Sequence, residues 1–66
     1  MKMLIIDVCD RVSKSGKPFR QAAIRGSGKS GDFLFVGIVP PDFQVGETYN
    51  NNVVFNHQGN AYVLPY

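Results

Sequence analysis

The chain has 66 residues, which allows one small domain with a marginal core, because a chain this short buries roughly 60% of the surface that it exposes when unfolded. Its composition, 44% hydrophobic and 18% charged with a net charge of +2, is typical of a folded globular protein and excludes a disordered chain. A single cysteine, Cys9, and a single histidine, His57, exclude an internal disulfide and a four-ligand zinc site, so we expect neither a metal nor another cofactor.

The first predicted strand begins near the start of the chain and runs to about Val12. Apolar and polar residues alternate along it, so one face is expected to be core: Leu4, Ile6 and Val8. Residues 13–18 form a turn, in which glycine and proline interrupt the alternation. The chain therefore opens as a strand followed by a hairpin.

The second predicted strand runs from about Phe19 to Arg25. Ala22 and Ile24 share one face, which we expect to be core. The opposite face carries Phe19, Gln21, Ala23 and Arg25. Residues 26–31 contain only glycine, serine and one lysine, so we expect a flexible loop after this strand.

The third predicted strand, Asp32 to Val39, stops at Pro40-Pro41, because proline cannot donate a ladder hydrogen bond. We expect its aliphatic face to be core: Leu34, Val36 and Ile38. The opposite face, expected to point outward, carries Phe33, Phe35 and Gly37.

The end of the chain predicts two more strands, about Tyr49–Asn56 and Ala61–Leu64, on either side of a turn at residues 57–60. Residues 42–47 connect them to the third strand. Five short strands without a long helix predict one all-β domain over residues 1–66, a small five-stranded antiparallel barrel. Because disulfides and metals are excluded, self-association is the remaining way to stabilise so small a core, and we expect a homodimer. Its surface would use apolar residues of the last strands: Tyr49, Val53, Phe55, Tyr62 and Leu64.

Six of the seven basic side chains lie in one block of the sequence without an acid between them. They are Arg11, Lys14, Lys17, Arg20, Arg25 and Lys29. Such a block is a candidate site for a polyanion. The alternative is a solvated hairpin whose lysines only keep the protein in solution.

Three phenylalanines accompany the basic block. If the aliphatic faces are core, Phe19, Phe33 and Phe35 point outward beside it. Exposed rings on which bases stack, together with lysine and arginine along the phosphates, are typical of surfaces that bind single-stranded nucleic acid. The alternative is a β-bulge that shifts the register and turns one or two of the rings into the core. The full predicted binding site is Arg11, Lys14, Lys17, Phe19, Arg20, Gln21, Arg25, Lys29, Phe33 and Phe35.

No catalytic constellation is recognisable in the sequence. His57 sits in a predicted turn without a nucleophile nearby, and no base that would activate Cys9 is identifiable. Asp7 and Asp10 are three apart in a strand and therefore face opposite ways. We expect a binding protein that is not an enzyme and takes no small-molecule substrate.

The hairpin sequence Lys14-Ser15-Gly16-Lys17-Pro18-Phe19 resembles the basic, glycine- and proline-containing turn of the filamentous-phage single-stranded DNA-binding proteins, the gene V protein family. The order of features around it is also similar: a short first strand, a later strand with aromatics, a break at Pro40-Pro41 and a closing hairpin over residues 53–65. The resemblance implies a five-stranded OB-type barrel that forms a homodimer. It also implies cooperative, sequence-independent binding of single-stranded DNA, which coats phage strands during replication.

The resemblance also implies roles for single residues. Phe19 would be the stacking ring at the tip of the DNA-binding hairpin, with Lys14 and Lys17 as phosphate contacts. Phe33 would match an exposed aromatic of the family, and Arg11 would replace a basic residue on the first strand. The chain departs from the pattern in its late hairpin, because the turn at residues 57–60 has no aromatic and residues 61–66 have no basic side chain.

The leading hypothesis is therefore a single-stranded DNA-binding protein without catalytic activity. One alternative is a small barrel that binds other proteins through its aromatics, since aromatics and arginine are enriched in the cores of protein interfaces. Another is an RNA-binding barrel of the cold-shock type. No segment approaches the roughly 20 apolar residues of a spanning helix or the core of a signal peptide. Together with the free cysteine, this favours the cytoplasm, that of the host if a phage encodes the protein.

Overall fold

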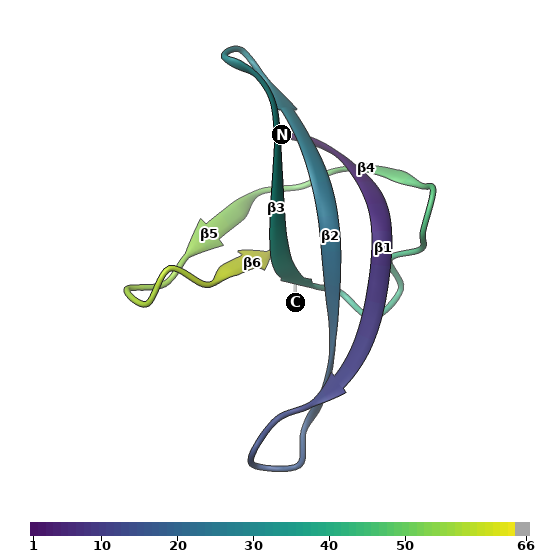
Figure 1. Ribbon diagram of the computed structural model, residues 1–66, viewed down its shortest axis with the longest axis vertical. Helices are drawn as coiled ribbons and strands as arrows, with labels where there is room; N and C mark the ends of the chain where they lie inside the picture. The colour runs from purple at the N-terminus through teal and green to yellow at the C-terminus, as the bar shows by residue number, and fades with distance from the viewer. Residues whose placement is uncertain (65–66) are drawn as a thin grey trace.

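The computed structural model describes residues 1–64 as one curled, open β-sheet, a half-barrel without helices among those residues (Figure 1). Its six strands are β1 (Lys2–Val12), β2 (Pro18–Gly28), β3 (Gly31–Val39), β4 (Thr48–Asn50), β5 (Val53–Phe55) and β6 (Ala61–Val63). The strand order is β4-β1-β2-β3-β6-β5. The all-β prediction is confirmed. Residues 65–66, the end of the predicted closing hairpin, lie outside the described residues.

The long strands β1, β2 and β3 form the centre of the sheet and are antiparallel to one another. Their concave face carries the core, and we call the opposite face the outer face. The core residues are Met3, Ile5, Ala22, Ile24, Val39, Phe43 and Val63. The prediction that Ala22 and Ile24 belong to the core is confirmed.

A β-bulge in β1 changes which residues of that strand are buried. Ile5 lies opposite Ile24 and Asp7 opposite Ala23, so Ile6 is the extra residue. Met3 and Ile5 are buried, whereas Ile6 is 47% exposed. The predicted core face of Leu4, Ile6 and Val8 is therefore wrong for its first two members; Val8, which follows the bulge, does pack against the core.

The third strand is turned the other way from the prediction. Phe35 lies opposite Ile24 and therefore shares the concave face with it. Phe35 packs against the core and Val39 is buried, whereas Leu34 and Val36 are 71% and 57% exposed. Both faces of this strand are apolar, so alternation alone could not decide which one is buried.

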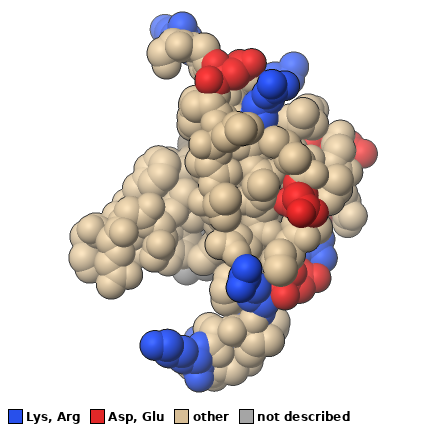
Figure 2. All heavy atoms as spheres, in the orientation of Figure 1, with Lys and Arg blue, Asp and Glu red and all other residues tan. Residues whose placement is uncertain are grey.

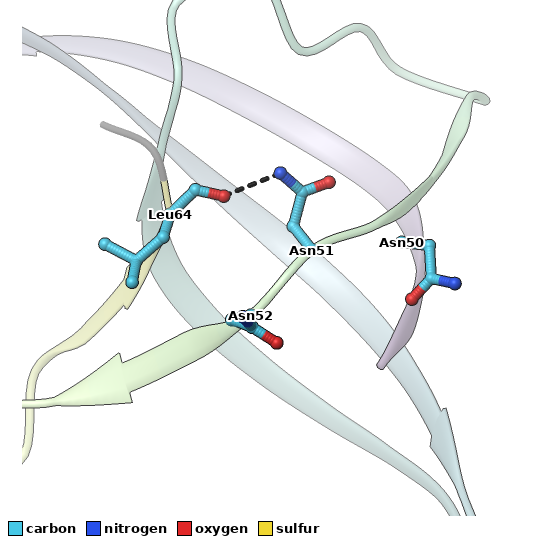
Figure 3. A pocket seen from close by; sticks show the side chains of 4 residues that line it. All are labelled: Asn50, Asn51, Asn52 and Leu64. Carbon is cyan, nitrogen blue, oxygen red and sulfur yellow. Dashed lines mark hydrogen bonds between the residues drawn. The ribbon is translucent and has the colours of Figure 1, made fainter.

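The predicted strand over residues 49–56 is two strands, which is why the sheet has six strands and not five. β4 pairs with β1 at one edge, and β5 pairs with β6 at the other. Asn51 and Asn52 connect them across the molecule (Figure 3). The Asn51 side-chain amide donates a hydrogen bond of 2.6 Å to the Leu64 carbonyl, and the Leu64 N–H donates to the Asn52 carbonyl at 2.9 Å. These bonds fix the crossing, and the hollow between Asn50 and Leu64 lies beside it.

Two aromatic rings cover one end of the core. Phe43, in the connector after β3, stacks on Tyr49 of β4 with ring centroids 3.7 Å apart. The Tyr49 hydroxyl accepts a hydrogen bond from the Gln44 N–H at 2.9 Å. Tyr49 and Val53 pack against the core, so the surface predicted for a dimer is in part interior.

Within residues 1–64 there is no helix of the length and hydrophobicity required to cross a membrane.

Candidate nucleic-acid interface

The turn between β1 and β2, residues 13–17, projects at one end of the molecule, and we call it the wing (bottom of Figure 1). The Ser13 N–H donates to the Lys17 carbonyl and the Gly16 N–H to the Ser13 carbonyl, both at 2.9 Å. Gly16 has a φ of 84°, a conformation that favours glycine. Lys14 and Lys17 are exposed on this ordered turn. The wing therefore presents two ammonium groups on a defined loop.

At the base of the wing, Arg11 of β1 and Phe19 of β2 are direct cross-strand partners. They lie on the outer face, because the next pair in this register, Asp10 and Arg20, belongs to the concave face. Arg11 is exposed and Phe19 is half-buried. Cross-strand side chains lie about 5 Å apart at their Cβ atoms. This pair therefore brings a cation next to an aromatic ring.

A groove of about 410 Å³ runs from this pair toward the β5–β6 hairpin. It is lined by Phe19, Gln21, Val36, Gly37, Ile38, Gly59, Asn60 and Ala61. The hairpin turn is fixed by Asn56, whose side-chain oxygen accepts bonds from the Gln58 and Asn60 N–H groups at 2.9 and 3.0 Å. The groove thus has a ring at one side, the Gln21 side chain in its wall, and a polar turn at the other side.

Arg20, by contrast, is held on the concave side of the sheet. Its Nε and Nη2 donate to the two carboxylate oxygens of Asp10 at 2.8 and 3.1 Å, and its Nη1 donates to the Phe43 carbonyl at 2.8 Å. The hydrogen bond from Arg20 lowers the pKa of Asp10. Asp10, just before the basic block, occupies the guanidinium of Arg20, so the structure does not bring Arg20 together with the wing.

The remaining basic residues of the block lie far from the wing. Arg25 is on the outer face between Leu4 and Leu34, and Lys29 is in the turn between β2 and β3. That turn and the wing lie at opposite ends of the long axis, which measures 38 Å (Figures 1 and 2). Figure 2 shows lysine and arginine side chains at both ends. The sequence block is therefore not one surface patch.

The two other predicted rings, Phe33 and Phe35, are on the concave face. Their centroids are 5.5 Å apart and the rings are stacked. Phe33 lies over Gly26, where an added Cβ would come within 3.0 Å of its ring. The prediction that all three phenylalanines point outward together is wrong, because the register places Phe19 on the opposite side of the sheet.

The structure therefore brings together five of the ten predicted binding residues: Arg11, Lys14, Lys17, Phe19 and Gln21. Gly59 and Asn60 join them across the groove, although the sequence offered only a turn signal for them. No group of histidine, cysteine and carboxylate side chains within residues 1–64 could hold a metal ion. No protein-family model, curated protein or solved structure matches this chain.

Proposed function

We propose that the protein binds single-stranded DNA without sequence specificity, through the wing and the groove beside it. A base stacks on Phe19, while Arg11, Lys14 and Lys17 neutralise the phosphates on either side. The side-chain amides of Gln21 and Asn60, which line the groove, accept or donate hydrogen bonds along the strand. Stacking tolerates any base, because every base has a π-face.

One observation carries the proposal: Arg11 and Phe19 are cross-strand partners on the outer face, directly beside the wing and its two lysines. A cation and a ring side by side provide for both parts of a nucleotide, the phosphate and the base. The carboxylate of Asp10, which precedes Arg11 in β1, is paired with Arg20. The outer side of the wing is therefore electropositive.

We also propose that the half-barrel is an OB-type domain. Two features support an OB-type domain that coats single strands, cooperatively, during phage replication: the curled half-barrel and the wing, whose sequence resembles the hairpin of the gene V protein family. RNA is the nearest competing ligand, because a stacked base and a neutralised phosphate are common to both nucleic acids.

The test is a titration followed by fluorescence anisotropy, with labelled oligo(dT), oligo(U) and a duplex of equal length. We expect oligo(dT) to bind with the highest affinity and the duplex with the lowest, since paired bases are not available for stacking. Equal affinity for the duplex would show that charge alone drives binding, and no binding of any oligonucleotide at low salt would refute the proposed function.

A further inference from the structure

The groove proposed for DNA has two walls that are held in different ways. One wall comes from β2 and β3, which pair with each other along their whole length. The other wall is the turn at residues 59–60, which leads into β6. β6 pairs with β3 at two positions, Gly37 with Ala61 and Ile38 with Tyr62. The place of the second wall therefore depends on a short contact between β3 and β6.

At Gly37 the two strands approach so closely that there is no room for a side chain. A Cβ atom added at Gly37 would lie 3.1 Å from the Cβ of Ala61 and 3.2 Å from the Ala61 carbonyl oxygen. Carbon atoms in ordinary contact are about 3.5–4.0 Å apart. These atoms of Ala61 belong to the backbone or are bonded directly to it, so they cannot rotate away. A methyl group at Gly37 would therefore push β6 away from β3.

The far end of β6 is fixed by different bonds. The Asn51 side-chain amide donates to the carbonyl of Leu64, the residue just after β6, and the Leu64 N–H donates to the Asn52 carbonyl (Figure 3). The end beside the groove begins at Ala61, opposite Gly37. A change at Gly37 should therefore move the groove wall more than the crossing at Asn51 and Asn52.

We propose that Gly37 is a positioning residue that sets the width of the groove, and thereby the size of base that is held beside Phe19. This inference rests on the proposed DNA binding. Gly37 and Ala61 are both buried, so they act through the position of the turn at Asn60. Parts of a binding site must be placed to within about 0.5 Å, so a shift of a few tenths of an ångström at β6 is large enough to matter.

A wider groove has a predictable effect on base preference. Any base loses contact with one wall when the turn moves away from Phe19. A pyrimidine loses more of this contact than a purine, because the second ring of a purine extends further across the groove. The affinity for oligo(dA) relative to oligo(dT) should therefore rise.

The first experiment compares Gly37→Ala with the unchanged protein by fluorescence anisotropy, using labelled oligo(dT) and oligo(dA). We expect the affinity for oligo(dT) to fall by about three- to tenfold, less than the loss of a whole stacked base, and the ratio of oligo(dA) to oligo(dT) affinity to rise. The slope of log K against log salt should not change, because the phosphate contacts of the wing remain. A loss of folded protein would lower both affinities equally, so the ratio separates positioning from a purely structural role.

Two further variants sharpen this test. Gly28→Ala is the matched control, because it also adds a methyl group to a strand glycine but meets no atom within 4 Å, and it should bind like the unchanged protein. Ala61→Gly added to Gly37→Ala removes the methyl group that the new one meets, and it should restore part of the affinity and of the ratio. If circular dichroism shows that Gly37→Ala is unfolded, Asn51→Ala replaces it, since this change releases β6 from the Leu64 carbonyl without adding an atom. Asn51→Ala should weaken oligo(dT) binding at an unchanged salt slope.

Several results would overturn the proposal. A folded Gly37→Ala with unchanged affinity would do so, as would one in which both affinities fall by the same factor or one that Ala61→Gly does not rescue. If Asn51→Ala has to be used, normal oligo(dT) binding by that variant would overturn it. Failure of the unchanged protein to bind any oligonucleotide would refute the proposed function itself, whereas normal binding by the unchanged protein with an unaffected Gly37→Ala would refute only the role of Gly37.

Discussion

The two ends of the central strands β1, β2 and β3 carry the same kinds of residue, basic side chains and phenylalanines, in different arrangements. At the wing end, Phe19 lies on the outer face with Arg11 beside it and two lysines below it. At the other end, the turn with Lys29 leads into Phe33, which lies on the concave face over Gly26 and stacks on Phe35. In our proposal the first end offers its ring to a ligand. At the other end Phe35 packs against the core, and Phe33, 41% exposed, stacks on it.

The difference follows from strand parity. Phe19 is an odd number of residues away from Ala22 and Ile24, the buried residues of β2, so its side chain points to the other face. Phe35 lies directly opposite Ile24 in the neighbouring strand and shares its face. A shift of one residue in either strand would exchange the two roles. Proximity of aromatic and basic residues in the sequence is therefore insufficient to define a binding surface.

The largest effect should come from removing the ring that packs against the core. Phe35→Ala should lower the free energy of unfolding by about 3 kcal/mol, near the lower limit for a buried phenylalanine because Phe35 is partly exposed. For a domain of this size that corresponds to a fall in melting temperature of more than about 10 °C. Thermal unfolding followed by circular dichroism measures it. An unchanged melting temperature would mean that the rings of β3 do not support the core.

The salt dependence of DNA binding should distinguish the lysines of the two ends. With three phosphate contacts, the slope of log K against log salt should be about −2, from roughly −0.7 per contact on a single strand. Lys14→Ala should flatten it by about 0.7, whereas Lys29→Ala, the matched control at the far turn, should leave it unchanged. Equal effects of the two variants would contradict a site confined to the wing end.

The smallest effect concerns Arg20, the arginine that is paired with Asp10. Arg20 lowers the pKa of Asp10 below its ordinary 3.8 in the folded state. This contribution to stability is therefore present above pH 3.8 and is lost as the pH falls further, through the lowered pKa of the folded state. Asp10→Asn should therefore show a shallower decrease of melting temperature between about pH 5 and 3 than the unchanged protein. If the melting temperatures of the two proteins decrease equally between pH 5 and 3, the pair of Arg20 and Asp10 does not stabilise the fold.

Much of the fold was predictable because alternation and turn residues are local signals. From glycine and proline, the sequence predicts the wing, the end of β3 at Pro40-Pro41 and the turn at residues 57–60 close to their observed positions. The division at Asn51 and Asn52 was missed. Three consecutive asparagines, residues 50–52, interrupt the apolar pattern there, but they do not show that the chain crosses from one sheet edge to the other.

The faces of the strands were harder to predict than the strands. The bulge at Ile6 has no sequence signal, and it reverses which residues of β1 are buried. In β3 both faces are apolar, so the choice depends on the curvature of the whole sheet. The pairing of Arg20 with Asp10 required the cross-strand register. These are tertiary features, and they decided which predicted site residues lie together.

The central claim is that Phe19 binds a base, and one paired measurement tests it most directly. Phe19→Ala and Phe33→Ala are compared for oligo(dT) affinity and for melting temperature in the same samples. Phe19→Ala should weaken binding by about 1–3 kcal/mol, the range for a stacked base, with little change in melting temperature. Phe33→Ala should leave binding unchanged and lower the melting temperature. The opposite pattern, with binding lost in Phe33→Ala and stability lost in Phe19→Ala, would contradict the assignment of the outer face to DNA.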